Sequence, residues 1–219
     1  MSTPEKLKSS AGSRRYLLWF LYLPVYLICF FLLERHITPD SAYWVSYMPL
    51  DDCIPFVEAF AIPYCTWYPF LLGTAVYLAV RDRREFCRYA HFLVLGLSIS
   101  LLICLIFPNG QDLRPAVMPR DNVFTRLVSL IYAADTNTNV FPSMHVVGMI
   151  AGTSALFHAE CARRLRFPAA ALTVLVAAST VFIKQHSFLD ILGGAALCIP
   201  LYAAVYAPGY FRDKKGGNK

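Results

Sequence analysis

Apolar residues gather in six long segments that are separated by short polar stretches. The segments cover residues 16–33, 56–80, 89–107, 141–157, 168–183 and 188–208. Crossing the hydrocarbon core of a bilayer takes roughly 17 to 25 helical residues, so the fifth segment is marginal and the others are long enough. None shows the alternation that a membrane β-barrel requires. The pattern predicts an all-α, polytopic membrane protein: one domain, residues 1–219, with six transmembrane helices in one bundle.

Lysine and arginine are divided unevenly between the two sides of this bundle. If the amino terminus lies in the cytoplasm, 15 of the 20 Lys and Arg residues fall on the cytoplasmic side. The positive-inside rule requires such a bias, and an odd number of spans would destroy it. Both termini are therefore expected in the cytoplasm, as a segment of residues 1–15 and a tail of residues 209–219. The net charge of +6 then reflects topology, which argues against nucleic acid as a partner.

The same topology places several polar stretches on the extracytoplasmic side. They are a loop of about residues 108–140, "FPSMH" at the start of the fourth segment, and "IKQHSFLD" between the fifth and sixth. His145 and His186 lie in the last two stretches, at membrane depth and beside other polar groups. Ionisable side chains are costly there, so a shared functional site is the default hypothesis.

The stretch "KQHSFLD" places a histidine four residues before an aspartate. His186 and Asp190 share one face if the sixth helix begins early enough. The carboxylate would then hold one imidazole nitrogen and leave the other free as a nucleophile. Lys184 adds a positive charge nearby. The alternative interpretation is a lysine that extends to the interface, an interfacial histidine and a capping aspartate.

The stretch "FPSMH" contains two ordinary helix-start residues, Pro142 and Ser143, and one unusual residue, His145. The positive end of the helix dipole disfavours imidazolium in the first turn, and a bound anion would reverse this penalty. Backbone N–H groups at such a helix start bind phosphate, and an imidazolium there can protonate a leaving oxygen. Arg114, in "LRP", is a candidate for binding phosphate through two hydrogen bonds from its guanidinium.

Three motifs in this order resemble those of the type 2 phosphatidic acid phosphatase superfamily, which shares its site with vanadium-dependent haloperoxidases. They are "RP" at 114–115, "PSMH" at 142–145 and "STVFIKQHSFLD" at 179–190. The resemblance implies that His186 attacks phosphorus to form a phosphohistidine, that Asp190 orients His186, and that His145 protonates the departing alcohol. It also implies that Arg114, Ser143 and backbone amides hold the phosphate oxygens. The scheme requires no metal and no cofactor.

Three positions depart from the motifs of that superfamily. Phe107 stands where the first motif has a lysine, Met144 replaces the glycine of the second motif, and Thr180 replaces the arginine of the third. Two phosphate-binding cations are therefore absent from their usual places, and Lys184 is expected to supply one such charge. "FPSMH", "KQHSFLD" and the upstream "PYCTWYPF" look most like the inositol phosphorylceramide synthase-like branch.

The first functional hypothesis is a membrane lipid phosphatase that hydrolyses a lipid phosphate or diphosphate at the extracytoplasmic face. The second is a lipid phosphotransferase with the same intermediate, which passes a phospho head group to a lipid alcohol. The third, from another class, is a transport or proton-sensing membrane protein. Polar residues should then be distributed through several helix centres, whereas here they gather at one face.

Overall fold

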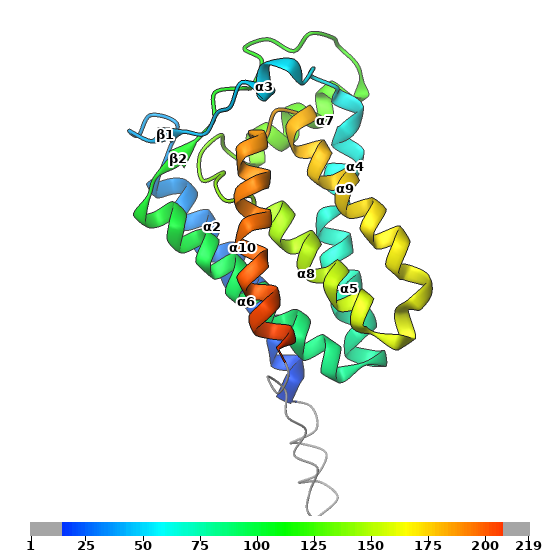
Figure 1. Ribbon diagram of the computed structural model, residues 1–219. Coiled ribbons are helices and arrows are strands. Elements are labelled where there is room, and N and C mark those ends of the chain that lie inside the picture. Colours follow the sequence, from blue (N-terminus) through cyan, green and yellow to red (C-terminus); the bar gives the residue numbers. More distant parts are fainter. Residues whose placement is uncertain (1–14, 208–219) are drawn as a thin grey trace, which may run out of the picture.

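The computed structural model describes residues 15–207 of the chain. The expected cytoplasmic segments, residues 1–15 and 209–219, lie outside this range except for Arg15. The first and the last described helices meet the same end of the bundle (Figure 1). The basic turn between α5 (Trp67–Arg81) and α6 (Arg83–Ile106) also lies at this end.

The described chain is predominantly helical, as the sequence predicts. Beside α5 and α6, the long helices are α2 (Tyr22–His36), α7 (Val123–Ala134), α8 (Met144–His158), α9 (Arg166–Phe182) and α10 (Phe188–Tyr206). Shorter helical elements are η1 (Arg15–Leu21), α3 (Leu50–Cys53), η2 (Glu58–Phe60), α4 (Ala61–Cys65) and η3 (Glu160–Leu165). Strands β1 (Trp44–Val45) and β2 (Asn109–Gly110) form a parallel pair, with Trp44 opposite Asn109 and Val45 opposite Gly110.

Four helical stretches are long and apolar enough to cross a membrane. They are Tyr16–His36, Arg83–Ile106, Glu160–Phe182 and Phe188–Tyr206. The other two expected spans correspond to shorter helices, because α8 has 15 residues and the segment 56–80 is divided into η2, α4 and α5. The division between α4 and α5 has a local cause: Pro69 has no N–H to donate to the carbonyl of Cys65. Six spans with cytoplasmic termini therefore remain a prediction.

The expected loop over residues 108–140 contains a helix in its second half, where α7 forms. Asn122 caps this helix, because its side chain accepts hydrogen bonds from the N–H groups of Phe124 and Thr125. Three of its residues are buried at intervals of three, Thr125, Val128 and Ile131. The helix packs on α4 and η2 near Ile183. At 12 residues, α7 is too short to be recognised from the sequence as a span.

Helix α8 is the centre of the bundle and packs against α5, α6, α9 and α10 (Figure 1). Its small buried residues allow this close packing. A Cβ atom added at Gly148 would lie 2.8 Å from Nε1 of Trp67, and one added at Gly152 would lie 2.6 Å from the ring of Phe70. These two glycines therefore let α5 approach the helix that carries His145.

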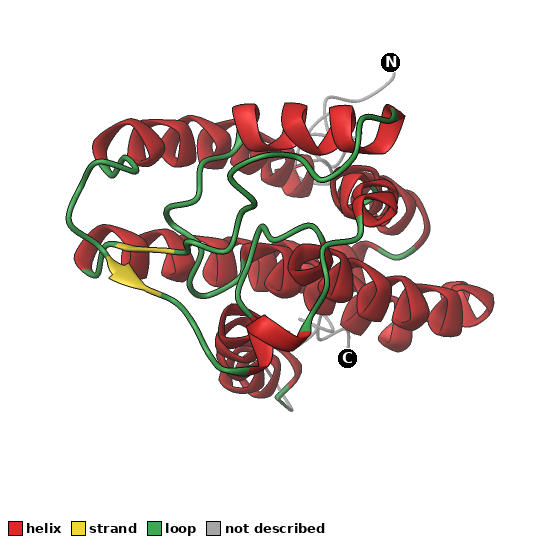
Figure 2. Cartoon of the chain, turned by 90° about the horizontal axis from the view of Figure 1, so that it is seen from above, coloured by secondary structure: helices red, strands yellow, loops and turns green. Residues whose placement is uncertain are grey.

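The loops cross over one end of the bundle (Figure 2), the end at which α8 and α10 begin. Both of these helices begin at a serine cap. The side chain of Ser143 accepts from the N–H of Val146, and that of Ser187 accepts from the N–H of Leu189. Ser187 and Asp190 complete a capping box, since the Asp190 carboxylate accepts from the Ser187 N–H. Two helix starts thus meet under the same loops.

Candidate active site

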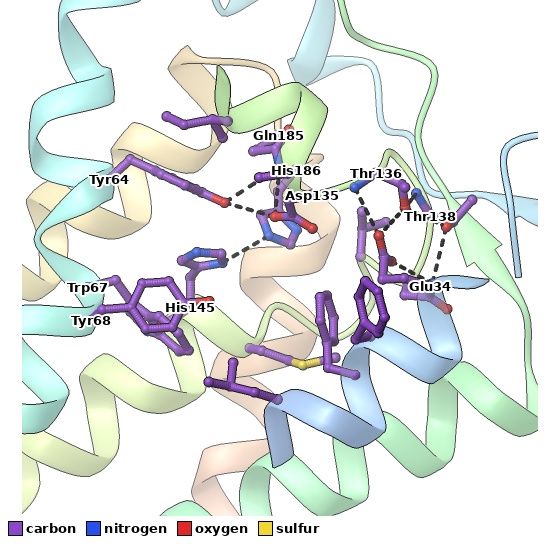
Figure 3. Close-up of a pocket in the computed structure, with 18 of the residues that line it drawn as sticks. Glu34, Tyr64, Trp67, Tyr68, Asp135, Thr136, Thr138, His145, Gln185 and His186 are labelled. Carbon is purple, nitrogen blue, oxygen red and sulfur yellow. Dashed lines mark hydrogen bonds between the residues drawn. The ribbon is translucent and has the colours of Figure 1, made fainter. Parts of the chain in front are cut away.

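A cavity of about 490 Å³ lies beneath these loops, between α2 on one side and α4 and α5 on the other. Its wall includes both histidines that the sequence singled out, His145 and His186 (Figure 3). The volume falls within the range of about 300 to 1,000 Å³ that is typical of small-molecule sites. The cavity is therefore large enough for a group beyond the phosphate itself.

The two histidines face one another directly. Nε2 of His186 lies 3.4 Å from Nδ1 of His145, and the two rings are inclined at 70°. His145 is the second residue of α8, whereas His186 lies in the turn between α9 and α10. The carbonyl of Thr180 accepts hydrogen bonds from the N–H groups of Gln185 and His186 and so holds this turn. The structure therefore brings together two residues that are 41 positions apart in the chain.

Asp190 lies behind His186, on the side away from His145. Its Oδ2 atom is 3.2 Å from Nδ1 of His186 and accepts a hydrogen bond of 2.9 Å from the N–H of Ser187. Its Oδ1 atom accepts a hydrogen bond of 2.5 Å from Oγ of Ser46. A carboxylate on Nδ1 favours the tautomer with its proton on Nδ1 and leaves the lone pair of Nε2 available. Nε2 of His186 is therefore the nucleophile candidate of this site.

His145 is held by two aromatic residues that the sequence did not identify as part of the site. The ring of Tyr64 lies 4.5 Å from that of His145, and the ring of Trp67 lies 4.8 Å away. Nε1 of Trp67 also donates a hydrogen bond to the carbonyl oxygen of His145. The aromatic stretch "PYCTWYPF" was the only signal of this contact in the sequence. The contacts with Tyr64 and Trp67 restrict rotation of the His145 ring.

Asp135 is a second residue that the sequence did not identify. Its Oδ2 atom accepts hydrogen bonds from the hydroxyl of Tyr64 and from Nε2 of Gln185, at 3.0 and 2.8 Å. Its Oδ1 atom accepts none from the described residues, and the side chain lines the cavity next to His186 (Figure 3). A carboxylate four residues before "NVFPSMH" was visible in the sequence, but nothing there showed that it turns toward His186.

Three residues expected to bind substrate have protein partners here. The guanidinium of Arg114 donates to the carbonyl oxygens of Asp135 and Thr136 and to Oε1 of Gln185. Nζ of Lys184 donates to the carbonyl oxygens of Asp51 and Ile54. Ser143 is fully buried, with its hydroxyl at the start of α8. None of the three side chains lines the cavity.

The three residues that depart from the family motifs each make a defined contact in the structure. Met144 lines the cavity, and its sulfur accepts a hydrogen bond of 2.9 Å from the hydroxyl of Tyr26. A glycine could not make this contact between α8 and α2. Thr180 is buried and holds the His186 turn through its carbonyl. Phe107 is partly exposed and packs on Trp44.

Within residues 15–207, no cluster of three or more His, Cys, Asp or Glu side chains has the arrangement of a metal site. What the site holds is a nucleophile candidate with its orienting carboxylate and, beside them, a second imidazole. Such a set suits transfer of a group through a covalent intermediate, with one residue as the acid and base.

Replacing Ser46 by alanine is expected to slow turnover about tenfold with little change in KM, which corresponds to about 1.4 kcal/mol. Ser46 is fully buried and gives Asp190 a hydrogen bond that helps to fix the His186–Asp190 pair. Initial rates measure the effect. Ser100→Ala is the matched control, because Ser100 is equally buried but donates to Gly96 within its own helix. Equal losses in both variants would contradict a positioning role for Ser46.

Comparison with known proteins identifies one family. The model of the PAP2 superfamily matches residues 92–213. No curated protein and no solved structure shows significant similarity to the chain. The matched range contains all six candidate site residues that the sequence analysis named, but not Ser46, Tyr64 or Trp67. The part of the chain that forms α2, α4 and α5 therefore completes the cavity from outside the matched region.

Proposed function

This chain belongs to the PAP2 superfamily, a family of phosphoesterases, and from that premise we propose that it is an integral membrane lipid phosphatase. It hydrolyses a lipid phosphate or diphosphate through a phosphohistidine on His186. The observation that carries the proposal is the alignment of Asp190, His186 and His145 along one line of contacts into the cavity.

The reaction begins with attack of Nε2 of His186 on phosphorus. A P–N bond forms, the P–O bond to the lipid breaks, and His145 gives its proton to the departing alcohol oxygen. Asp190 stabilises the positive charge that develops on the His186 ring. A water molecule then attacks phosphorus, the P–N bond breaks, and the proton of the water passes to His145. Both half-reactions use the same two imidazoles, so no further acid or base is required.

A lipid substrate suits the position of the cavity in the bundle. Leu27 and Phe31 of α2 and Tyr68 of α5 line the cavity and have exposed side chains. In a bilayer these apolar side chains would lie against acyl chains. The cavity thus offers a lateral route by which a phosphorylated head can reach the histidines while the tail stays in the membrane. The charge bias of the loops supports an active site on the extracytoplasmic face.

The phosphate oxygens are proposed to lie at the first turn of α8, where the helix dipole favours an anion and Ser143 caps the helix start. Arg114 reaches this region indirectly, because its hydrogen bond to Gln185 fixes the residue next to His186. Lys184 contributes from the same turn by holding its backbone to the loop at residues 51–54. In this arrangement Arg114 and Lys184 act on the phosphate through the turn that carries the nucleophile.

The second candidate is a lipid phosphotransferase that moves a phospho head group to a lipid alcohol. The size of the cavity favours it, since about 490 Å³ exceeds what a phosphate and a water molecule need. The inositol phosphorylceramide synthase-like appearance of the motifs supports the same alternative.

Incubating the purified protein with a lipid carrying labelled phosphate, with and without a lipid alcohol, separates the two candidates. Release of free phosphate in both incubations is the expected result for a phosphatase. A labelled phosphodiester that forms only when the alcohol is present would establish the transferase instead. The His186→Ala protein is the control for contaminating phosphatases. Absence of any labelled product with all lipids would overturn both.

A further inference from the structure

Six aromatic side chains line the cavity from two opposite sides. Helix α2 and the α4–α5 segment each contribute three, and Figure 3 shows those of the second group around His145. The six are Tyr26, Phe30, Phe31, Tyr64, Trp67 and Tyr68. The faces of aromatic rings carry negative charge density and attract cations within about 6 Å, and cages of such rings bind quaternary ammonium groups.

Two carboxylates lie on the same cavity. The Glu34 carboxylate accepts hydrogen bonds from the N–H and the hydroxyl of Thr136 and from the side-chain amide of Asn139. Asp135 accepts the two hydrogen bonds described above and lies between His186 and the group around Glu34 in this view (Figure 3). All five donors are neutral. Neither carboxylate forms a salt bridge with a lysine or arginine in residues 15–207.

The cations of the described chain near the cavity do not form salt bridges with these two carboxylates. Arg35 is the only lysine or arginine of the described chain that lines it, and its guanidinium lies over the ring of Phe31. Arg114 donates to the backbone carbonyl of Asp135 and not to the carboxylate. Burial raises the pKa of the Asp135 carboxyl, and the nearby His186 and Arg114 only partly oppose this shift.

An anionic phosphate that enters the cavity would lie close to these two carboxylates. The repulsion is offset if the substrate brings its own positive charge to the carboxylates and the rings. A ligand in which a phosphate and a positively charged nitrogen are a few bonds apart would place the phosphate near His186 and the nitrogen near the carboxylates.

We propose that the cavity binds a lipid phosphoester whose polar end carries a protonated or quaternary amine, with the nitrogen between the aromatic walls and the carboxylates of Glu34 and Asp135. The placement of its phosphorus at His186 rests on the proposed function. Such a nitrogen occurs in two sources: the aminoalcohol head group of a phosphodiester lipid, and the amine of a sphingoid base phosphate. Binding of the nitrogen itself does not depend on catalysis.

The test measures binding of phosphocholine and of glycerol 3-phosphate to the full chain, by quenching of tryptophan fluorescence. It uses the His186→Ala protein, so that turnover does not interfere. We expect phosphocholine to bind about tenfold more tightly than glycerol 3-phosphate. Glu34→Gln, which removes one charge, should abolish most of this preference, whereas Glu160→Gln, at a surface ion pair, should leave it unchanged. Equal affinity for both probes in the parent protein would overturn the proposal.

A second pair of variants keeps the test valid if Glu34→Gln does not fold. Tyr68 is exposed at the cavity and makes no side-chain hydrogen bond within the described chain. Tyr68→Leu removes the ring and should weaken phosphocholine binding about threefold, while Tyr68→Phe keeps the ring and should retain it. If both variants lose the same amount of phosphocholine affinity, or if neither loses any, the aromatic cage is contradicted.

Turnover of labelled lipids then identifies the source of the nitrogen. Reaction with phosphatidylcholine or phosphatidylethanolamine indicates a head-group amine, and reaction with sphingosine phosphate indicates a base amine. A phosphocholine preference without turnover of any lipid would support the binding site and contradict the proposed function. Turnover with phosphatidate preferred over every amine-bearing lipid would support the function and overturn the inferred binding site.

Discussion

Replacing His186 by alanine is expected to abolish turnover, with a loss of at least about 10⁴-fold, and to eliminate labelling of the protein by substrate phosphate. The reason is that Nε2 of His186 is the atom that forms the bond to phosphorus, and no other described nucleophile adjoins both Asp190 and His145. Rapid quenching in alkaline denaturant after mixing with labelled lipid, followed by counting of protein-bound phosphate, measures the intermediate. Steady-state release of phosphate measures the turnover.

The matched control for this experiment is His36→Ala. His36 is exposed at the end of α2 and does not line the cavity. It should retain the activity and the labelling of the unmodified protein. A His186→Ala protein that melts at the parent temperature and still turns over at the parent rate would refute the phosphohistidine mechanism.

Replacing His145 by alanine is expected to slow formation of the intermediate by about 10² to 10⁴-fold when the leaving group is a lipid alcohol. His145 supplies the proton that such a poor leaving group needs, and Nδ1 of its ring lies 3.4 Å from the attacking nitrogen. A nitrophenyl phosphate leaves without protonation, so the variant should form the intermediate from it at nearly the parent rate. Single-turnover labelling with both substrates gives the two rates.

The diagnostic quantity for His145 is the ratio of these two rates. Trp67→Phe serves as a comparison, because it removes the hydrogen bond to the His145 carbonyl and leaves the imidazole in place. It should slow both substrates equally and only slightly. A His145→Ala protein that loses the same factor with both leaving groups would show that His145 has a role other than proton donation.

The motifs predicted the chemical groups of the site better than their surroundings. His145, His186 and Asp190 were identified because short spacings in the sequence carry them, such as the four positions from His186 to Asp190, although His186 lies in the turn before α10 and not on the helix. Ser46 escaped notice because it is 144 positions from Asp190, and the two meet only when the loop containing β1 folds over α10. Glu34 escaped for the same reason, since it bonds to Thr136 across 102 positions. Such long-range contacts leave no periodic trace.

The residues expected to bind substrate show that a motif does not predict which partners a side chain has in the folded chain. Arg114 and Lys184 carry charges that phosphate would attract, and the sequence offered no competing partners for them. In the folded chain, backbone carbonyls of neighbouring loops take up both side chains. A buried cation must be satisfied by the groups nearest to it, and those groups are determined by loop paths that composition does not encode.

The sequence by itself determined that this is a helical, apolar chain, where most of its long helices lie, and which family the motifs between residues 114 and 190 resemble. Hydrophobic segment length and motif spacing are local properties, so they can be read without a fold. Only the tertiary structure decided that α7 forms within the expected loop, that Tyr64 and Trp67 hold His145, and that Glu34 and Asp135 share a cavity with aromatic walls. These features arise where distant segments pack together, and it is packing that decides which side chains turn toward a common space.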